Sequence, residues 1–179
     1  MDNQQVSQLN DTDLAWIAGI VEGEGYIGLS KRIKPELQYV PRIQVINSDG
    51  LMLEAIGKIL EKRNIAYYKH RWDVDHRRRV KIYDNYGKRN RKMGDIVFVG
   101  LGRVKRVLDA ILPYMRGERT ERAKLVLEFC NYRLGKKTEN NYAPYSDYEH
   151  NLYNKLRKIV ENPRDYTLNP LRDDIVQTI

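Results

Sequence analysis

The ten residues from Ile17 to Tyr26 limit the fold of this chain more than any other segment. They begin as an apolar helix rich in small residues and end with Glu22 and Glu24, which flank Gly23. The C-terminal end of a helix carries a partial negative charge, so carboxylates are unfavourable there. The position of Glu24 therefore predicts a compensating cation, and a metal ion is the leading candidate.

Small residues recur along one side of this predicted helix. Ala15, Gly19 and Gly23 follow one another at four-residue spacing, which places them on one face. A glycine inside a helix costs about 1 kcal/mol relative to alanine. That cost indicates a packing role, because small residues allow another backbone to approach closely. The alternative is an ordinary core helix that ends near Gly25.

Two alternating segments follow the helix. Residues 26–33 and 39–47 alternate between apolar and polar side chains, the pattern of half-buried strands. A turn at 34–36 joins them into a predicted hairpin, and Pro41 favours an edge strand or a strand start. Further periodicity predicts helices at 51–63, 103–112, 120–134 and 151–160, strands at 65–72 and 95–99, and room for a short strand at 80–83. The predicted fold class is α+β, in the order αββαββα plus further helices.

Basic residues are concentrated in one part of the chain. The whole sequence has 32 Lys and Arg against 24 Asp and Glu, a net charge of +8. Between Lys62 and Arg106 there are 15 basic and 4 acidic residues, or +11, which leaves 17 basic and 20 acidic elsewhere, or −3. Such a concentration is typical of a polyanion-binding surface. A solvated charged face would mix signs, and the runs at 77–79 and 88–92 do not.

Residues 17–25 follow the pattern aliphatic–Ala–Gly–aliphatic–aliphatic–acid–small–acid–Gly. This segment resembles the LAGLIDADG motif of homing endonucleases, although both acids are Glu here and Asp is more common in the family. The order of elements extends the resemblance over about 12–134, and residues 100–103 lack the carboxylates of a second motif. The resemblance implies one domain over 1–179. Its αββαββα core would hold a curved four-stranded antiparallel DNA-binding sheet backed by helices, and 135–179 would form a helical extension and tail.

The resemblance also implies an activity. A chain with one motif is expected to act as a homodimer that hydrolyses both strands of a long pseudo-palindromic DNA site and leaves a short 3′ overhang. Mg²⁺ is the expected cofactor, Mn²⁺ is expected to substitute, and Ca²⁺ is expected to bind without supporting cleavage. Oxygen ligands suit such ions, and one or two carboxylates plus DNA phosphates suffice.

The resemblance also implies roles for individual residues, taken position by position from the family motif. Glu24 matches the metal-binding acid of the family motif, and Gly23 matches the position whose backbone carbonyl also binds metal. Glu22 matches the first acid, which is more structural than catalytic. Asn47 ends the second predicted strand, where the family often places a polar residue that orients the attacking water.

The resemblance also implies a basic active-site residue after the segment Leu112–Tyr114. By position it falls on Glu118, or on Arg119 if one residue is inserted, and Arg116 is the fallback. We assign it to Arg119, because a cation stabilises the charge on a phosphate under attack and a carboxylate does not.

The residues expected to contact DNA point away from the core in the predicted strands. Arg pairs well with guanine and Gln with adenine in the major groove. The set is Tyr26, Ser30, Arg32, Arg42, Gln44, Lys69 and Arg71.

Other readings remain open. A non-cleaving relative could act as an intron RNA-splicing maturase or as a DNA-binding regulator, with intron RNA as a partner. A basic structural protein would explain the charge but not Gly19, Gly23 and Glu24 together. The single cysteine, Cys130, is expected to be a buried helix residue and fits a reducing intracellular compartment, either a prokaryotic cytoplasm or an organelle with its own genome. No membrane segment or signal peptide is expected.

Overall fold

The computed structural model describes residues 3–33, 37–72, 93–136 and 144–161. The predicted turn at 34–36, the short strand at 80–83 and the basic runs at 77–79 and 88–92 lie outside these residues. The described elements, in chain order, are α1 (Asn3–Glu24), β1 (Gly25–Arg32), β2 (Gln38–Asn47), α2 (Gly50–Lys62), β3 (Tyr68–Trp72), β4 (Met93–Val99), α3 (Leu101–Ile111), η2 (Leu112–Tyr114), α4 (Arg119–Gly135) and α5 (Asp147–Glu161). The predicted α+β class and αββαββα order are confirmed.

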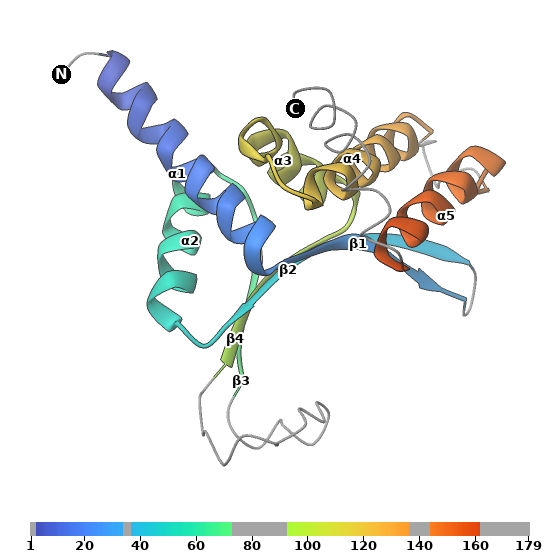
Figure 1. The fold of residues 1–179 in the computed structure, drawn as a ribbon, viewed down its shortest axis with the longest axis horizontal. Helices are drawn as coiled ribbons and strands as arrows, with labels where there is room; N and C mark the ends of the chain where they lie inside the picture. Colours follow the sequence, from blue (N-terminus) through green and yellow to red (C-terminus); the bar gives the residue numbers. More distant parts are fainter. Residues whose placement is uncertain (1–2, 34–36, 73–92, 137–143, 162–179) are drawn as a thin grey trace, which may run out of the picture.

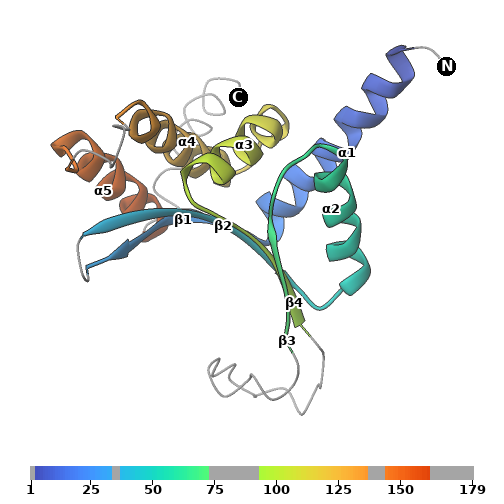
Figure 2. The same ribbon diagram turned by 180° about the vertical axis from the view of Figure 1, so that it is seen from behind.

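The four strands form one antiparallel sheet in the order β1-β2-β4-β3. The sheet is strongly curved, and all described helices lie on its convex side (Figures 1 and 2). Ile27, Ile43, Ile96 and Phe98 point to that side and form one continuous core with the helices. No helix of the described residues lies over the concave side, so the described sheet presents an open face there.

Pro41 occurs inside an interior strand, whereas the sequence favours an edge strand or a strand start. The ladder between β2 and β4 begins only at Arg42, which pairs with Val99. The Pro41 carbonyl accepts a hydrogen bond from Gly100 N at 3.1 Å. The missing N–H would point to that same side, beyond the end of the β4 ladder, so no strand hydrogen bond is lost. Gly100 turns the chain from β4 into α3 at φ +94°, a region that glycine adopts readily.

Helix α5 joins the core through both apolar and polar contacts. Leu152 and Leu156 are buried in the main core. A fully buried Glu149 accepts a hydrogen bond from Arg133 of α4 at 3.2 Å. The hydroxyl of Tyr39 and Nδ1 of His150 form a hydrogen bond of 2.8 Å. Because a buried charge is costly unless it is paired, these contacts fix α5 in one position on α4 and the sheet.

Cys130 is fully buried in α4. Burial raises the pKa of its thiol to about 12. The reactive species is the thiolate, which at about pH 8 would then be only about one part in ten thousand of the thiol. We expect native protein to react with a disulfide reagent far more slowly than protein unfolded in guanidinium, followed by absorbance. Equal rates in the two states would show that Cys130 is accessible.

Candidate active site and nucleic-acid interface

Glu24 and Asn47 meet at the end of α1. Pairing of β1 with β2 places Gly25 opposite Val45, so the end of the helix lies beside the end of β2. The Asn47 Nδ2 donates a hydrogen bond to Oε2 of Glu24. Residues 23 positions apart in the sequence, both predicted to be catalytic, are therefore in direct contact.

The other end of the Asn47 side chain is also engaged. Its Oδ1 accepts a hydrogen bond from Asp49 N at 2.8 Å, and Asp49 caps α2 by accepting from Leu51 N at 2.9 Å and Met52 N at 3.1 Å. Since a carboxylate only accepts, the Asn47 amide nitrogen must face Glu24. Asn47 thus orients the Glu24 carboxylate. Its predicted role toward an attacking water stays a prediction.

A glycine makes the turn from α1 into β1. A Cβ on Gly25 would lie 2.5 Å from the carbonyl oxygen of Val21, a distance that no side chain tolerates. Gly25 therefore lets β1 leave the helix directly after Glu24. The last-turn carbonyls, which include that of Gly23, have no acceptor role within the helix, and both Gly23 and Glu24 are exposed.

The Glu24 carboxylate and the Gly23 carbonyl are oxygen ligands that fit Mg²⁺. An exposed carboxylate and an exposed helix-terminal carbonyl are both hard oxygen ligands. The described residues contain no group of three or more His, Cys, Asp or Glu side chains that could hold a metal ion. A single chain therefore offers Glu24 and Gly23 as a partial ligand set.

Glu22 has a different environment from Glu24. Its Oε1 accepts hydrogen bonds from Arg116 N at 2.9 Å, from Gly117 N, and from the Thr120 hydroxyl at 3.0 Å. These donors belong to the loop before α4 and to its first turn. A carboxylate is favourable at a helix N-terminus, so Glu22 ties the end of α1 to the start of α4.

Removing the Glu22 carboxylate should destabilise the fold. We expect Glu22→Ala to lower the free energy of unfolding by about 2 kcal/mol, since it removes a charged acceptor from three donors at a helix start. Urea denaturation followed by circular dichroism measures the change. Glu118→Ala is the matched control: within the described residues Glu118 forms a 3.7 Å ion pair with Arg122, and such a pair contributes little at the surface. Equal losses in both variants would contradict this role of Glu22.

The three candidates for the basic position differ in their contacts. The Arg116 guanidinium donates to the carbonyls of Pro113 at 2.7 Å and Met115 at 2.8 Å, so it holds its own loop. Glu118 pairs with Arg122. Arg119 is the first residue of α4, and among the described residues no ion pair or hydrogen bond engages its guanidinium. Arg119 therefore remains the cation available near the end of α1.

The open face of the sheet carries five of the residues predicted to contact DNA. The register pairs Tyr26 with Gln44 and Gly28 with Arg42, and side chains of paired residues lie on the same side. Tyr26 is 41% exposed, and its ring lies over Gly28. The Nε of Arg42 is buried and has no hydrogen-bond partner in the described part of the chain. This face carries Tyr26, Ser30, Arg32, Arg42 and Gln44.

The register corrects the face expected for Lys69. In β3, Lys69 pairs with Ile96, and Ile96 points into the core. The Lys69 ammonium instead lies 3.9 Å from the carboxylate of Glu54 on α2. The sequence did not decide to which side of the sheet each residue of β3 points, because Tyr68–Trp72 has no alternation of apolar and polar residues. The side chain of Arg71 lies outside the described part of the chain, so its predicted DNA contact stays a prediction.

Tyr68, which precedes Lys69, occupies the open face that the sequence assigned to Lys69. Tyr68 pairs with Val97 and is 48% exposed, and the Arg103 guanidinium stacks 4.5 Å from the centre of its ring. Sequence reasoning missed both Tyr68 and Arg103. The position of Tyr68 follows from the β-pairing register, which the structure alone gives. No sequence pattern marked Arg103, which lies near the start of α3.

The small-residue strip on α1 is open. Ala15, Gly19 and Gly23 are exposed, and a Cβ added to either glycine would meet nothing within 4 Å. Trp16, beside the strip, is 41% exposed. Nothing in the described part of the chain therefore explains two helix glycines at this position.

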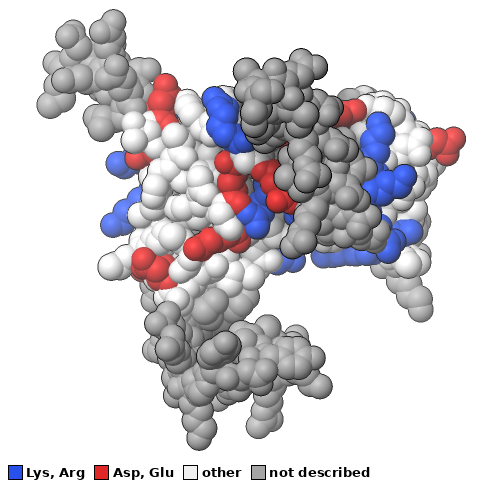
Figure 3. All heavy atoms as spheres, in the orientation of Figure 1, with Lys and Arg blue, Asp and Glu red and all other residues white. Residues whose placement is uncertain are grey.

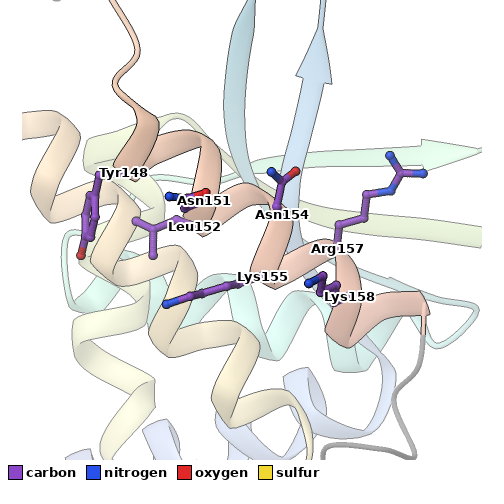
Figure 4. Close-up of a pocket in the computed structure, with 7 residues that line it drawn as sticks. All are labelled: Tyr148, Asn151, Leu152, Asn154, Lys155, Arg157 and Lys158. Atoms are coloured by element: carbon purple, nitrogen blue, oxygen red, sulfur yellow. The ribbon is translucent and has the colours of Figure 1, made fainter.

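Charge and shape separate two regions of the surface. Acidic side chains gather where α1 ends, and Lys and Arg side chains lie over α5 (Figure 3). A hollow of about 610 Å³ runs along α5, lined by Tyr148, Asn151, Leu152, Asn154, Lys155, Arg157 and Lys158 (Figure 4). None of the predicted site residues lines it. The candidate site at Glu24 is an exposed surface site, not a cavity.

No helix in the described part of the chain is long and apolar enough to cross a membrane.

The chain is an α+β protein whose architecture suits nucleic acid. Its curved antiparallel sheet is backed by helices and has one open polar face, and an acidic site lies at the end of a small-residue helix.

No family sequence model matches the chain, and no curated protein matches it in sequence. Solved structures do match. The homing endonuclease I-CvuI in complex with a DNA target has a TM-score of 0.52 and 19% identity, over 82% of this chain and 96% of that one.

The K262A mutant of I-SmaMI has a TM-score of 0.51 and 12% identity, over 85% of this chain. The match spans only 49% of the I-SmaMI chain. The present chain therefore has the fold of the LAGLIDADG homing endonucleases, and the resemblance predicted from the sequence is confirmed at the level of the fold.

Proposed function

We propose that the chain is a sequence-specific DNA endonuclease of the homing type, active as a homodimer with a divalent metal ion. The observation that carries the proposal is the contact between Glu24 and Asn47 at the end of an open small-residue strip. An exposed, oriented carboxylate at a helix C-terminus has no evident structural purpose, whereas Glu22 two residues earlier clearly has one.

Each residue would have a distinct task in the reaction. A bound Mg²⁺ would supply charge neutralisation on the scissile phosphate and activation of water. Glu24 and the Gly23 carbonyl would hold it, and Asn47 keeps the Glu24 carboxylate in one orientation. Arg119 would stabilise the additional negative charge on the phosphate. The products would be two cut strands with a short 3′ overhang.

The dimer completes the site. One chain supplies a single oriented acid, and a second copy packed along Ala15, Gly19 and Gly23 would bring in the partner's acid. Two carboxylates brought close together repel unless cations lie between them, which again favours a metal. The chain spans about half of I-SmaMI, which supports the idea that two copies of this unit form one enzyme. Two-fold symmetry predicts a pseudo-palindromic target.

The open sheet face would lie in the major groove. Tyr26, Ser30, Arg32, Arg42 and Gln44 offer donors and acceptors for base edges. The unpartnered Nε of Arg42 supports a ligand at this face, since buried donors normally have partners. We further propose that the protein acts in a reducing intracellular compartment, as its single buried thiol suggests.

A selection experiment tests the function. Protein is bound to a pool of random-sequence DNA duplexes in Ca²⁺, and the retained duplexes are sequenced and then given Mg²⁺. We expect enrichment of a pseudo-palindrome and cleavage of both strands within it. Enrichment without cleavage in Mg²⁺ or Mn²⁺ would favour a DNA-binding regulator. Retention of RNA but not of any DNA sequence would favour a splicing role.

A further inference from the structure

A buried acid lies on the open face of the sheet. Asp95 of β4 pairs with Ile46 of β2, so it lies on the same side as Arg42 and Gln44, away from the helices. It is only 2% exposed. A negative charge is unfavourable on a surface that receives a polyanion, so its presence there calls for a local function.

That function is visible in its contact with Gln44. The Gln44 Nε2 donates a hydrogen bond of 2.6 Å to Oδ2 of Asp95. A free glutamine amide can rotate and present either its oxygen or its nitrogen. A carboxylate only accepts hydrogen bonds, so rotation would set the Gln44 oxygen against the Asp95 oxygen. Asp95 therefore takes one of the two Nε2 hydrogens of Gln44 and fixes the orientation of the amide, which holds Oε1 in place as an acceptor for an outside partner.

A fixed acceptor discriminates between bases. In the major groove, adenine N6 and cytosine N4 are donors, whereas guanine O6 and N7 and thymine O4 are acceptors. We propose that Asp95 is a positioning residue for sequence specificity, which holds Gln44 as an acceptor so that the base it meets must be adenine or cytosine. This inference rests on the proposed DNA-binding function and adds a specificity determinant that sequence reasoning did not find.

The test uses four forms of the full-length protein in the random-duplex selection in Ca²⁺: the native chain, Asp95→Asn, Gln44→Met and Asp109→Asn. Asp95→Asn keeps the shape but offers an amide that donates or accepts, so Gln44 can rotate. Asp109→Asn makes the same chemical change on α3, where Asp109 pairs with Lys105 at 2.7 Å.

We expect the native chain to prefer adenine or cytosine by about tenfold or more at one position in each half-site. Gln44→Met should lose the preference there, and Asp95→Asn should admit guanine and thymine at that same position. Asp109→Asn should behave like the native chain. Unchanged preference in Asp95→Asn, or a uniform loss at every position, would overturn the proposal.

A second measurement does not depend on DNA or on a variant at Asp95. The side-chain amide signals of Gln44 in ¹⁵N-labelled native protein are identified by their absence in Gln44→Met. One proton should be shifted strongly downfield by the Asp95 hydrogen bond. Signals at the positions of a free glutamine would overturn the positioning role. A native chain that enriches no sequence but shows the shifted proton would instead count against the proposed function.

Discussion

Glu24→Gln is expected to reduce cleavage of the selected DNA target at least about 1,000-fold, a loss of about 4 kcal/mol of transition-state stabilisation. The amide keeps the size of the side chain and an oxygen that can accept from Asn47, so the fold should persist. It removes the charge that would hold a metal ion. Binding of the target in Ca²⁺, measured by gel shift, should fall far less than cleavage in Mg²⁺.

Glu121→Gln is the matched control for this substitution. Glu121 is an exposed acid in the first turn of α4 and pairs with Lys124 at 2.6 Å. Its replacement changes the net charge by the same amount, away from the site. It should cut DNA at the native rate. If Glu24→Gln also cut at the native rate, Glu24 would not be the metal-binding acid.

Gly19→Leu is expected to abolish double-strand cleavage by preventing dimerisation while leaving the single chain folded. The position is open within the chain, because a Cβ there would meet nothing within 4 Å. Replacing a helix glycine with leucine should even stabilise the monomer by up to about 1 kcal/mol. A second copy packed along the strip would clash with the leucine. Sedimentation should give twice the chain mass of 21.1 kDa for native protein and one chain mass for the variant.

Gly102→Leu separates dimerisation from a general effect of leucine on a helix. Gly102 lies in α3 and is exposed, and a Cβ added there would likewise meet nothing within 4 Å. This variant should remain dimeric and active. A native chain that cuts both strands as a monomer, or a Gly19→Leu variant that stays dimeric, would rule out the strip as the interface.

Much of the fold was predictable because periodicity reports which side of an element is buried. The alternation in β1 and β2 correctly identified the open-face positions Tyr26, Arg42 and Gln44. The same reasoning failed in β3, where the sequence does not alternate between apolar and polar residues and Tyr68 occupies the face assigned to Lys69. The edge strand or strand start expected at Pro41 was wrong, because the sequence does not show where the hydrogen-bond ladder between β2 and β4 begins.

The sequence by itself determined the helix of small residues, its two terminal acids, the hairpin after it and the order of elements. These follow from local backbone preference and hydrophobic period. Only the tertiary structure separated the roles of the acids: Glu22 meets the start of α4, whereas Glu24 meets Asn47. Only the sheet brought Asp95 to Gln44 across 51 positions of sequence. Such pairs depend on register and on where a distant helix begins, and no local pattern encodes either.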